Sequence, residues 1–456
     1  MNRLMIAAPS SGSGKTLITC ALIKALKDRG INLRSYKCGP DYIDPMFHRK
    51  VLGIEAGNLD TYFSDSDTII HTIATDSHEL AIIEGVMGLY DGLGGTEAIG
   101  SSYDLACVTR TPIILVVDVH GMGRTMISVI RGILSDDTEH LIKGIILNRI
   151  SEGFYNTMKP LIEADTEVKV LGFFKNNKDL KLESRHLGLV QPDELDNIDE
   201  MLSVAADTLI SGVDVDAIVE IAKSAEELID SVNRVDSLNE PASVRLAVAR
   251  DEAFSFYYEE NLKMFEEAGV EIVEFSPIHD TSLPENISGI LLGGGYPENY
   301  LKELSVNSDM LNALKVVISE RNIPTLAECG GFMYLHEEVK DESGINYPLV
   351  GVISGISWKE DHLVRFGYAE VVEKVSTFLP AEEIIKGHEF HYYDTSENGD
   401  ACVLRKPTTG KTWDACIENE NQFMGFVHLY YPSNPKFVSY FADRMKEYQQ
   451  KNYFQS

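Results

Sequence analysis

Two short segments, more than 300 residues apart, carry residues whose types and spacing suit chemistry. The first, Ala8–Thr16, follows an apolar run and opens an amphipathic stretch. A glycine-rich turn at a helix start directs backbone N–H groups at an anion, Lys15 would neutralise phosphate oxygens, and the Thr16 hydroxyl would bind Mg²⁺. Pro9 occupies the first glycine position of the full pattern, so the mouth of this loop departs from the common one. The expected nucleotide-binding residues are Ser11, Gly12, Ser13, Gly14, Lys15 and Thr16.

Carboxylates occur in two further segments that we expect at the same edge of a sheet. Asp41 and Asp44 lie three residues apart, close to Lys37, while Glu84 ends an apolar run and Asp91 follows it. Each Asp alone also suits a turn or a helix cap. Beside a phosphate loop, however, oxygen ligands favour Mg²⁺. The expected metal ligands are Thr16, Asp44 and Glu84.

Asn148 ends another apolar run and is followed by Arg149. Many proteins with a phosphate loop read the purine base at this position, so we expect Asn148 at the nucleotide. A polar start to an ordinary loop is the alternative.

The second segment, Ala327–Gly331, places Cys329 between small residues after an apolar run. This predicts a strand-to-helix turn that exposes a nucleophile, with cysteine in place of serine. A helix N-terminus is expected to lower the pKa of the thiol. Backbone N–H groups of Gly294, Gly295 and Gly330 are expected to bind an oxyanion. Any other cysteine here is better explained as a small buried apolar residue.

A thiol nucleophile needs a base, and histidine is the usual one. The candidates in this half of the chain are His279, His336, His362, His388, His391 and His428. His428 is expected to end a late hairpin strand before a Pro-Ser-Asn-Pro turn, which favours it. The segment Gly387–Tyr392 is the competitor.

Short apolar runs alternate with helical patterns in both halves of the chain, which predicts an α/β fold with mainly parallel sheets covered by helices. In the first half the expected strands are Arg3–Ala8, Glu79–Glu84, Ile113–Asp118, Gly144–Asn148 and Val168–Phe174, with helices at Lys15–Arg29 and Ala217–Val232. In the second half they are Val244–Ala249, Val270–Phe275, Gly289–Leu292 and Ile323–Ala327, followed by a hairpin at Ala415–Val427 and a helix at Pro435–Gln450. The polar stretch between the halves predicts domains at 1–232 and 244–456 and a linker at 233–243.

Composition limits the function classes. The 456 residues carry a formal net charge of −31, which argues against nucleic-acid binding and fits a soluble protein. No apolar run is long enough to span a bilayer. The six cysteines show no zinc-site or secreted-disulfide spacing, so we expect reduced thiols in the cytoplasm.

The motifs follow the order found in the cobyrinate a,c-diamide synthase family, which the chain resembles over essentially its whole length. The matching segments are Ser10–Thr16, Lys37–Pro45, Glu84–Gly92, Gly293–Glu298, Glu328–Phe332, Gly387–Tyr392 and Val427–Leu429. Similar proteins join a dethiobiotin-synthetase-like ATP domain to a class I glutaminase domain. Two further segments also match the family, Asp251–Tyr258 and Arg365–Tyr368. The resemblance implies that they pack between the domains or contact the corrin ring.

The resemblance implies a ligase that uses ATP, Mg²⁺, L-glutamine and cobyrinate. Cys329 would release ammonia from glutamine with His428 as the base. Ammonia would displace phosphate from an acyl phosphate made at the c and a carboxylates. The residues implied at the substrate end of the ATP site are Lys37, Asp41, Asp44 and Asp91. A homodimer is one assembly to expect.

One departure from the wider class concerns the base. Many class I glutaminases have a glutamate two residues after the catalytic histidine, whereas this chain has Tyr430. The residue that orients His428 is therefore undefined at this stage.

Two alternatives stay open. The same chemistry on hydrogenobyrinic acid or a nickel sirohydrochlorin is the nearer one, since no residue here can be tied to the macrocycle. A partition-type or cell-division ATPase is the more distant one, because those proteins usually carry lysine where this chain has Ser10.

Overall fold

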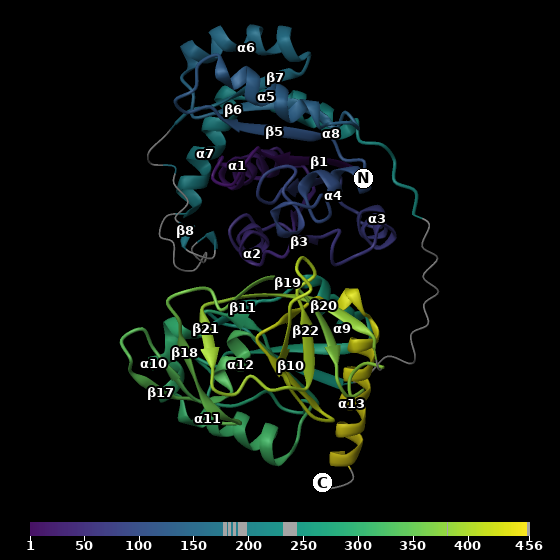
Figure 1. The fold of residues 1–456 in the computed structure, drawn as a ribbon, viewed down its shortest axis with the longest axis vertical. Coiled ribbons are helices and arrows are strands. Elements are labelled where there is room, and N and C mark those ends of the chain that lie inside the picture. Colours follow the sequence, from purple (N-terminus) through teal and green to yellow (C-terminus); the bar gives the residue numbers. More distant parts are fainter. Residues whose placement is uncertain are drawn as a thin grey trace. The chain divides into compact units, whose positions relative to one another are not determined.

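The computed structural model describes residues 1–176, 180, 184–185, 188–189, 198–230, 244–380 and 382–453. The chain divides into two compact units, Met1–Asn233 and Arg234–Ser456 (Figure 1). The segment predicted as a linker, 233–243, lies outside the described residues.

The first unit is built on a seven-stranded sheet in the order β3-β2-β4-β1-β5-β6-β7. Every neighbouring pair in this sheet is parallel. Because parallel strands end at the same edge, the segments after β1, β2 and β4 come together there. The strands are β1 (Asn2–Ala7), β2 (Leu33–Cys38), β3 (Ala56–Leu59), β4 (Leu80–Glu84), β5 (Ile113–Asp118), β6 (Ile142–Asn148) and β7 (Lys169–Phe174). A small hairpin, β8 (Ser184–Arg185) and β9 (Gly188–Leu189), lies apart from the sheet.

Helices cover both faces of this sheet, as the alternating side chains of β1 illustrate. Leu4 and Ile6 pack with one set of helices, while Met5 and Ala7 pack with the other. The first set is α1 (Lys15–Asp28), α2 (Ile43–Lys50), α7 (Ile198–Gly212) and α8 (Val215–Lys223). The second set is α3 (Ser66–Ala74), α4 (Ser102–Val108), α5 (Thr125–Ser135) and α6 (Glu152–Thr166).

The second unit has a six-stranded sheet in the order β12-β10-β13-β15-β25-β24, with only β24 antiparallel. Helices α9 and α13 pack on one face, and α10, α11 and α12 on the other. Its strands are β10 (Val244–Ala249), β12 (Val270–Phe275), β13 (Gly289–Leu292), β15 (Thr325–Glu328), β24 (Ile417–Glu418) and β25 (Gln422–Gly425). The helices are α9 (Glu259–Glu267), α10 (Leu301–Val306), α11 (Ser308–Lys315), α12 (Gly330–Tyr334) and α13 (Lys436–Tyr453).

Smaller sheets surround this core. The largest has the order β23-β22-β19-β20-β26, and the others have the orders β17-β16-β18-β21 and β11-β14. Their strands are β11 (Phe254–Phe256), β14 (Gly294–Gly295), β16 (His336–Lys340), β17 (Asn346–Pro348), β18 (Ile353–Lys359), β19 (Arg365–Glu373), β20 (Ile384–His391), β21 (Tyr393–Thr395), β22 (Cys402–Arg405), β23 (Thr412–Ala415) and β26 (His428–Leu429). The strand β26 pairs with β20 and brings His428 opposite His388.

The predicted α/β class is confirmed, and the ends of the predicted strands agree with the structure to within two residues. Strands β2 and β3 were not predicted, because β2 mixes polar and apolar residues without a regular period and β3 is only four residues long. The helix predicted at Ala217–Val232 was wrong at its end. It stops at Lys223, and Arg3 and Arg110 bind Glu226 beyond it.

The predicted hairpin at Ala415–Val427 exists as β24 and β25. His428 does not end a hairpin strand, however, because it starts the separate strand β26. Across the described ranges, no helix combines the length and apolar character needed to cross a membrane.

We expect Phe423→Ala to destabilise the second unit by about 3–5 kcal/mol, since it empties a well-packed position. Phe423 is 1% exposed and meets the rings of Phe378 and Phe437 at 6.0 and 5.5 Å between centroids. Both tryptophans of the chain, Trp358 and Trp413, lie in this unit, so urea unfolding followed by tryptophan fluorescence reports on it.

The matched control is Val375→Ala, at a side chain that is 73% exposed. It should change the free energy of unfolding by less than about 0.5 kcal/mol. Equal effects of the two substitutions would contradict the packing described here.

Candidate active sites

The phosphate loop lies between β1 and α1, where the sequence predicts it. Gly14, immediately before α1, has φ 90°, a left-handed conformation that glycine adopts without strain. The side-chain amide of Asn148 donates to the carbonyl of Ser13 at 2.8 Å, and Arg149 donates to the carbonyl of Gly12 at 3.1 Å. Asn148 and Arg149, at the end of β6, therefore hold the phosphate loop through its backbone carbonyls.

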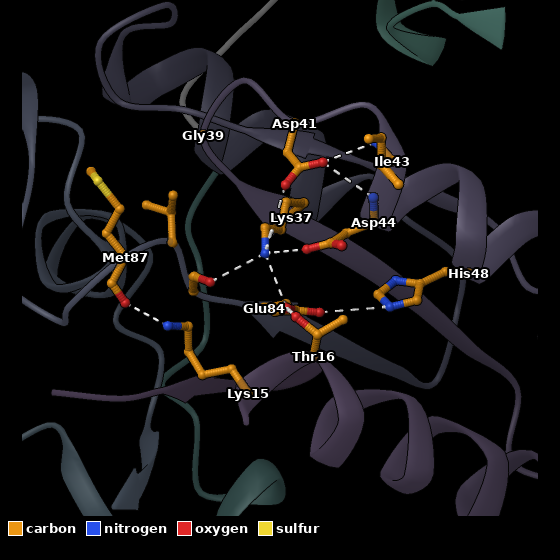
Figure 2. A network of polar contacts seen from close by, with 12 residues as sticks. Lys15, Thr16, Lys37, Gly39, Asp41, Ile43, Asp44, His48, Glu84 and Met87 are labelled. Atoms are coloured by element: carbon orange, nitrogen blue, oxygen red, sulfur yellow. Dashed lines mark hydrogen bonds and ion pairs between the residues drawn. The ribbon is translucent and has the colours of Figure 1, made fainter. Parts of the chain in front are cut away.

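Lys15 is the buried cation of this loop. Its ammonium donates to the backbone carbonyl of Met87 at 2.5 Å (Figure 2). It also donates to the carbonyl of Ser10 at 3.5 Å. No carboxylate of the described residues forms an ion pair with it. Burial, followed by the positive charge of Lys37, lowers the pKa of Lys15 to about 8. A further anion at the loop would oppose this shift by favouring the charged ammonium.

A buried cluster of charges lies at the ends of β2 and β4 (Figure 2). Its centre is Lys37, whose ammonium lies 2.5 Å from Asp44 Oδ2, 3.0 Å from Glu84 Oε1 and 4.0 Å from Asp41 Oδ2. Burial alone would lower the pKa of Lys37, but Asp44 and Glu84 outweigh it and raise the pKa well above its usual value. Lys37 is therefore charged at neutral pH.

The two closest carboxylates respond differently to the same environment. For Asp44, burial favours the neutral form, but the charge and hydrogen bond of Lys37 outweigh it and lower the pKa. For Glu84, burial and the repulsion from Asp44 raise the pKa to about 7 against the pull of Lys37. Asp44 is thus ionised at neutral pH, whereas the pKa of Glu84 lies close to neutral pH.

Glu84 also connects the cluster to the phosphate loop. Thr16 donates its hydroxyl to Glu84 Oε1 at 2.7 Å, so the three predicted metal ligands lie within one network. The other oxygen, Oε2, is buried without a hydrogen-bond partner among the described residues and lies 3.7 Å from His48 Nε2. A buried oxygen with spare acceptor capacity suits a hard cation, so these residues fit Mg²⁺.

The remaining predicted acids hold local structure at the same edge. Asp41 Oδ1 accepts the backbone N–H groups of Ile43 and Asp44 at the start of α2, and burial and Asp44 raise its pKa to about 6. Asp91 Oδ2 accepts the N–H of Gly88 at 2.9 Å. His48 is neutral because burial lowers its pKa to about 4. His48 was not predicted as a site residue, although it lies one helical turn after Asp44.

In the second unit Cys329 occupies the sharp turn between β15 and α12. It has φ 48° and ψ −103°, an unfavourable backbone conformation for a residue with a side chain. A Cβ on Gly331 would come within 2.2 Å of the Leu292 carbonyl, so the tight turn requires glycine there. The predicted strand-to-helix turn is present, but Cys329 is buried in it rather than exposed.

The expected low thiol pKa was wrong for this resting state. Burial, followed by the negative charge of Glu298, raises the pKa of Cys329 well above its usual value, and the N–H of Gly330 opposes this only in part. The helix that follows is only five residues long, so its dipole is small. Cys329 is therefore a thiol, and it needs a base to become a nucleophile.

His428 meets the glycine-rich segment that faces this turn. A Cβ on Gly294 would lie 2.3 Å from His428 Cε1, and a Cβ on Gly330 would lie 3.2 Å from Gly295 N. The predicted base and the three predicted oxyanion residues are therefore gathered around the cysteine turn. Burial, followed by His388, lowers the pKa of His428 well below its usual value, so the imidazole is neutral and able to accept a proton.

The competing segment supplies neighbours of His428. The ring of His388 stacks on that of His428 at 5.0 Å between centroids and 15° between planes. Its Nδ1 shares a hydrogen bond with the Tyr258 hydroxyl at 3.0 Å, and burial lowers its pKa to about 3. His391 instead stacks on Phe426 and binds the carbonyl of Tyr393.

Glu328, directly before Cys329, received no role in the sequence analysis. It is buried, and Oε1 accepts the Tyr431 hydroxyl at 2.8 Å. The backbone N–H of Leu429 also donates to this carboxyl. Burial raises the pKa of Glu328 to about 8, so the group is mostly neutral at neutral pH. The one feature of the sequence that could have drawn attention to Glu328 is its position directly before Cys329.

Comparison with known proteins assigns both units. Residues 4–190 match the family model described as "CobQ/CobB/MinD/ParA nucleotide binding domain", and residues 245–435 match "CobB/CobQ-like glutamine amidotransferase domain". Proteins named cobyrinate a,c-diamide synthase are similar over nearly the full length. The one from Thermoplasma volcanium is 38% identical and covers 98% of each chain. Those from Listeria innocua and Clostridium acetobutylicum are 37% and 38% identical, covering 95% and 96% of this chain and 97% and 99% of their own.

The raised pKa of Glu328 predicts a pH-dependent stability. Between pH 4.5, its usual pKa, and about pH 8, the unfolded chain releases a proton that the folded chain keeps, so this group destabilises the folded state progressively as the pH rises. Glu328→Gln cannot ionise and removes this contribution. We expect the melting temperature of the variant, relative to the unsubstituted protein, to increase from pH 5 to pH 8 and then level off. A constant difference across this range would contradict the assignment of a neutral Glu328.

Proposed function

The chain belongs to the cobyrinate a,c-diamide synthase family, and from this we propose that it is an ATP-dependent ligase that amidates the a and c carboxylates of cobyrinate with ammonia from L-glutamine. The observation that carries the proposal is one chain with a phosphate loop that contains Lys15 and a cysteine turn at Cys329 whose facing glycine segment contacts His428. A nucleotide-driven ATPase of the partition type would need only the first.

The glutaminase half of the reaction uses the cysteine turn. His428 takes the proton of the Cys329 thiol, and Sγ attacks the side-chain carboxamide carbon of glutamine. The N–H groups of Gly294, Gly295 and Gly330 stabilise the oxyanion that forms. His428 then gives its proton to the departing nitrogen, which leaves ammonia and a thioester. Water hydrolyses the thioester to glutamate and restores the thiol.

The ligase half uses the phosphate loop. Loop N–H groups and Lys15 hold the terminal phosphates of ATP, while a substrate carboxylate attacks the γ-phosphorus and displaces ADP. Ammonia then attacks the acyl phosphate carbon, and phosphate leaves to give the amide. Thr16, Asp44 and Glu84 would hold Mg²⁺, which supplies charge neutralisation for the phosphoryl oxygens when bound.

Lys37 suits the substrate end of this site. Its ammonium is charged and already bound to Asp44 and Glu84, so an anionic carboxylate or acyl phosphate meets one fixed cation in a chain that is acidic overall. Asp41 and Asp91, on the loops that follow β2 and β4, complete the proposed substrate surroundings. A purine-reading role for Asn148 stays a prediction, as do a cytoplasmic location and a homodimer.

Substitutions at Cys329 and Lys15 should separate glutamine hydrolysis from the ATP-dependent ligase reaction. Cys329→Ser should lower glutamine-dependent amidation by at least about 10³-fold, because the serine hydroxyl is a much weaker nucleophile in this setting. Ammonium chloride should still support amidation at a rate close to that of the unsubstituted protein. Lys15→Ala should abolish amidation from both nitrogen sources, since both need the acyl phosphate. Loss of both activities in Cys329→Ser would contradict the division into two sites.

The second prediction concerns the macrocycle. With ATP, Mg²⁺ and glutamine, we expect cobyrinate to give a product in which two carboxyl hydroxyls are replaced by amino groups. High-resolution mass spectrometry detects it as a slightly lighter molecule. Parallel incubations with hydrogenobyrinic acid and with nickel sirohydrochlorin test the alternatives. Turnover of either of these, with none of cobyrinate, would overturn the substrate assignment while leaving the chemistry intact.

A further inference from the structure

The position that usually orients the base of such a site is changed in this chain. Two residues after His428, where many class I glutaminases have a glutamate, the residue is Tyr430. Its backbone N–H donates to the carbonyl of Lys386 at 2.9 Å, and its ring meets Tyr258 edge-on at 5.2 Å between centroids. Tyr430 therefore packs the strand β26 in place and supplies no carboxylate.

A carboxyl group does contact the segment around His428, and it belongs to Glu328. Glu328 lies at the end of β15, directly before the nucleophile, and receives both the Tyr431 hydroxyl at 2.8 Å and the N–H of Leu429. Leu429 adjoins His428, and Tyr431 is three residues beyond it. One side chain thus connects the strand of the nucleophile with the strand of the base.

The same segment is held from α9 as well. Asn261 donates to the carbonyl of Leu429 at 2.8 Å and accepts the N–H of Tyr431 at 2.8 Å. Both Asn261 and Glu328 are buried, and hydrogen bonds away from water keep their geometry. With β20 bound along its other edge, the short strand β26 has few ways to move.

We propose that Glu328 is a positioning residue that replaces the missing glutamate of the triad: it fixes His428 through Leu429 and Tyr431 and ties the base to the residue before the nucleophile. The inference rests on the proposed function. It assigns Glu328 no contact with glutamine and no proton transfer.

The electrostatics fit this role. An ionised carboxylate next to Cys329 would oppose formation of the thiolate, because like charges repel. Burial raises the pKa of Glu328 to about 8, so at neutral pH the group holds its two partners mainly as a neutral acid. The position beside the nucleophile can then carry a carboxyl without a large electrostatic cost to the reaction.

The test compares two substitutions of similar size in the complete reaction with ATP, Mg²⁺, cobyrinate and glutamine. Glu328→Gln keeps an acceptor for Tyr431 and Leu429, and should keep kcat for glutamate release within about threefold. Glu328→Leu keeps the bulk but no acceptor, and should lower kcat by about 100-fold, the usual cost of a misplaced catalytic group. The KM for glutamine should change by less than about twofold in both variants, since Glu328 does not bind substrate.

Glu373→Leu is the matched control, because Glu373 is also a buried carboxyl of this unit that accepts two backbone N–H groups, from Thr377 and Phe378. It should leave glutamate release within about twofold. If Glu328→Leu does not fold, Tyr431→Phe tests the same contact. It should lower kcat by about 10-fold, and adding Glu328→Gln should change it little further, since contacts in one network are not additive.

Four results would overturn the inference: normal kcat in Glu328→Leu, normal kcat in Tyr431→Phe, a raised KM with normal kcat, or equal losses in Glu328→Gln and Glu328→Leu. Failure of the unsubstituted protein to release glutamate under the complete conditions would instead overturn the proposed function. The two failures are therefore distinguishable in one set of assays.

Discussion

The ion pairs of Lys37 are the interaction on which the first active site depends. Two carboxylates lie buried close together, Asp44 at the start of α2 and Glu84 at the end of β4. Without a cation between them, their repulsion and burial would favour protonation of the pair. With Lys37 present, Asp44 stays ionised and Glu84 titrates near neutrality. Thr16 joins this cluster through Glu84, so the end of the phosphate loop is held by the same group of buried charges.

In the second unit, by contrast, the buried residues of the site are mostly uncharged. Burial keeps Cys329, His428 and Glu328 predominantly uncharged, which avoids the cost of placing isolated charges in an apolar interior. The first unit concentrates buried charge at its proposed nucleotide site, whereas the second keeps the residues of its proposed thiol site uncharged. Each arrangement suits its reaction, since phosphoryl transfer must neutralise anions and thiol chemistry must create one.

The sequence predicted the parts that local pattern determines. Lys15, Thr16 and Cys329 lie within motifs that specify both a turn and a side chain, and the strands before them are short apolar runs. The role of Glu328 could not be predicted, because its partners Leu429 and Tyr431 are about 100 residues further along the chain. The low thiol pKa expected for Cys329 was wrong because burial depends on packing that no local motif reports. The strand of His428 was misassigned because β26 is two residues long and pairs with the non-local strand β20.

The burial of Cys329 has a consequence for the life of the protein between turnovers. Oxidants and electrophiles react with thiolates far faster than with thiols, and they need access to sulfur. Cys329 is buried and its raised pKa keeps it protonated, so it is protected on both counts. In the proposed reaction, burial and protonation thus protect the nucleophile from chemical damage between turnovers.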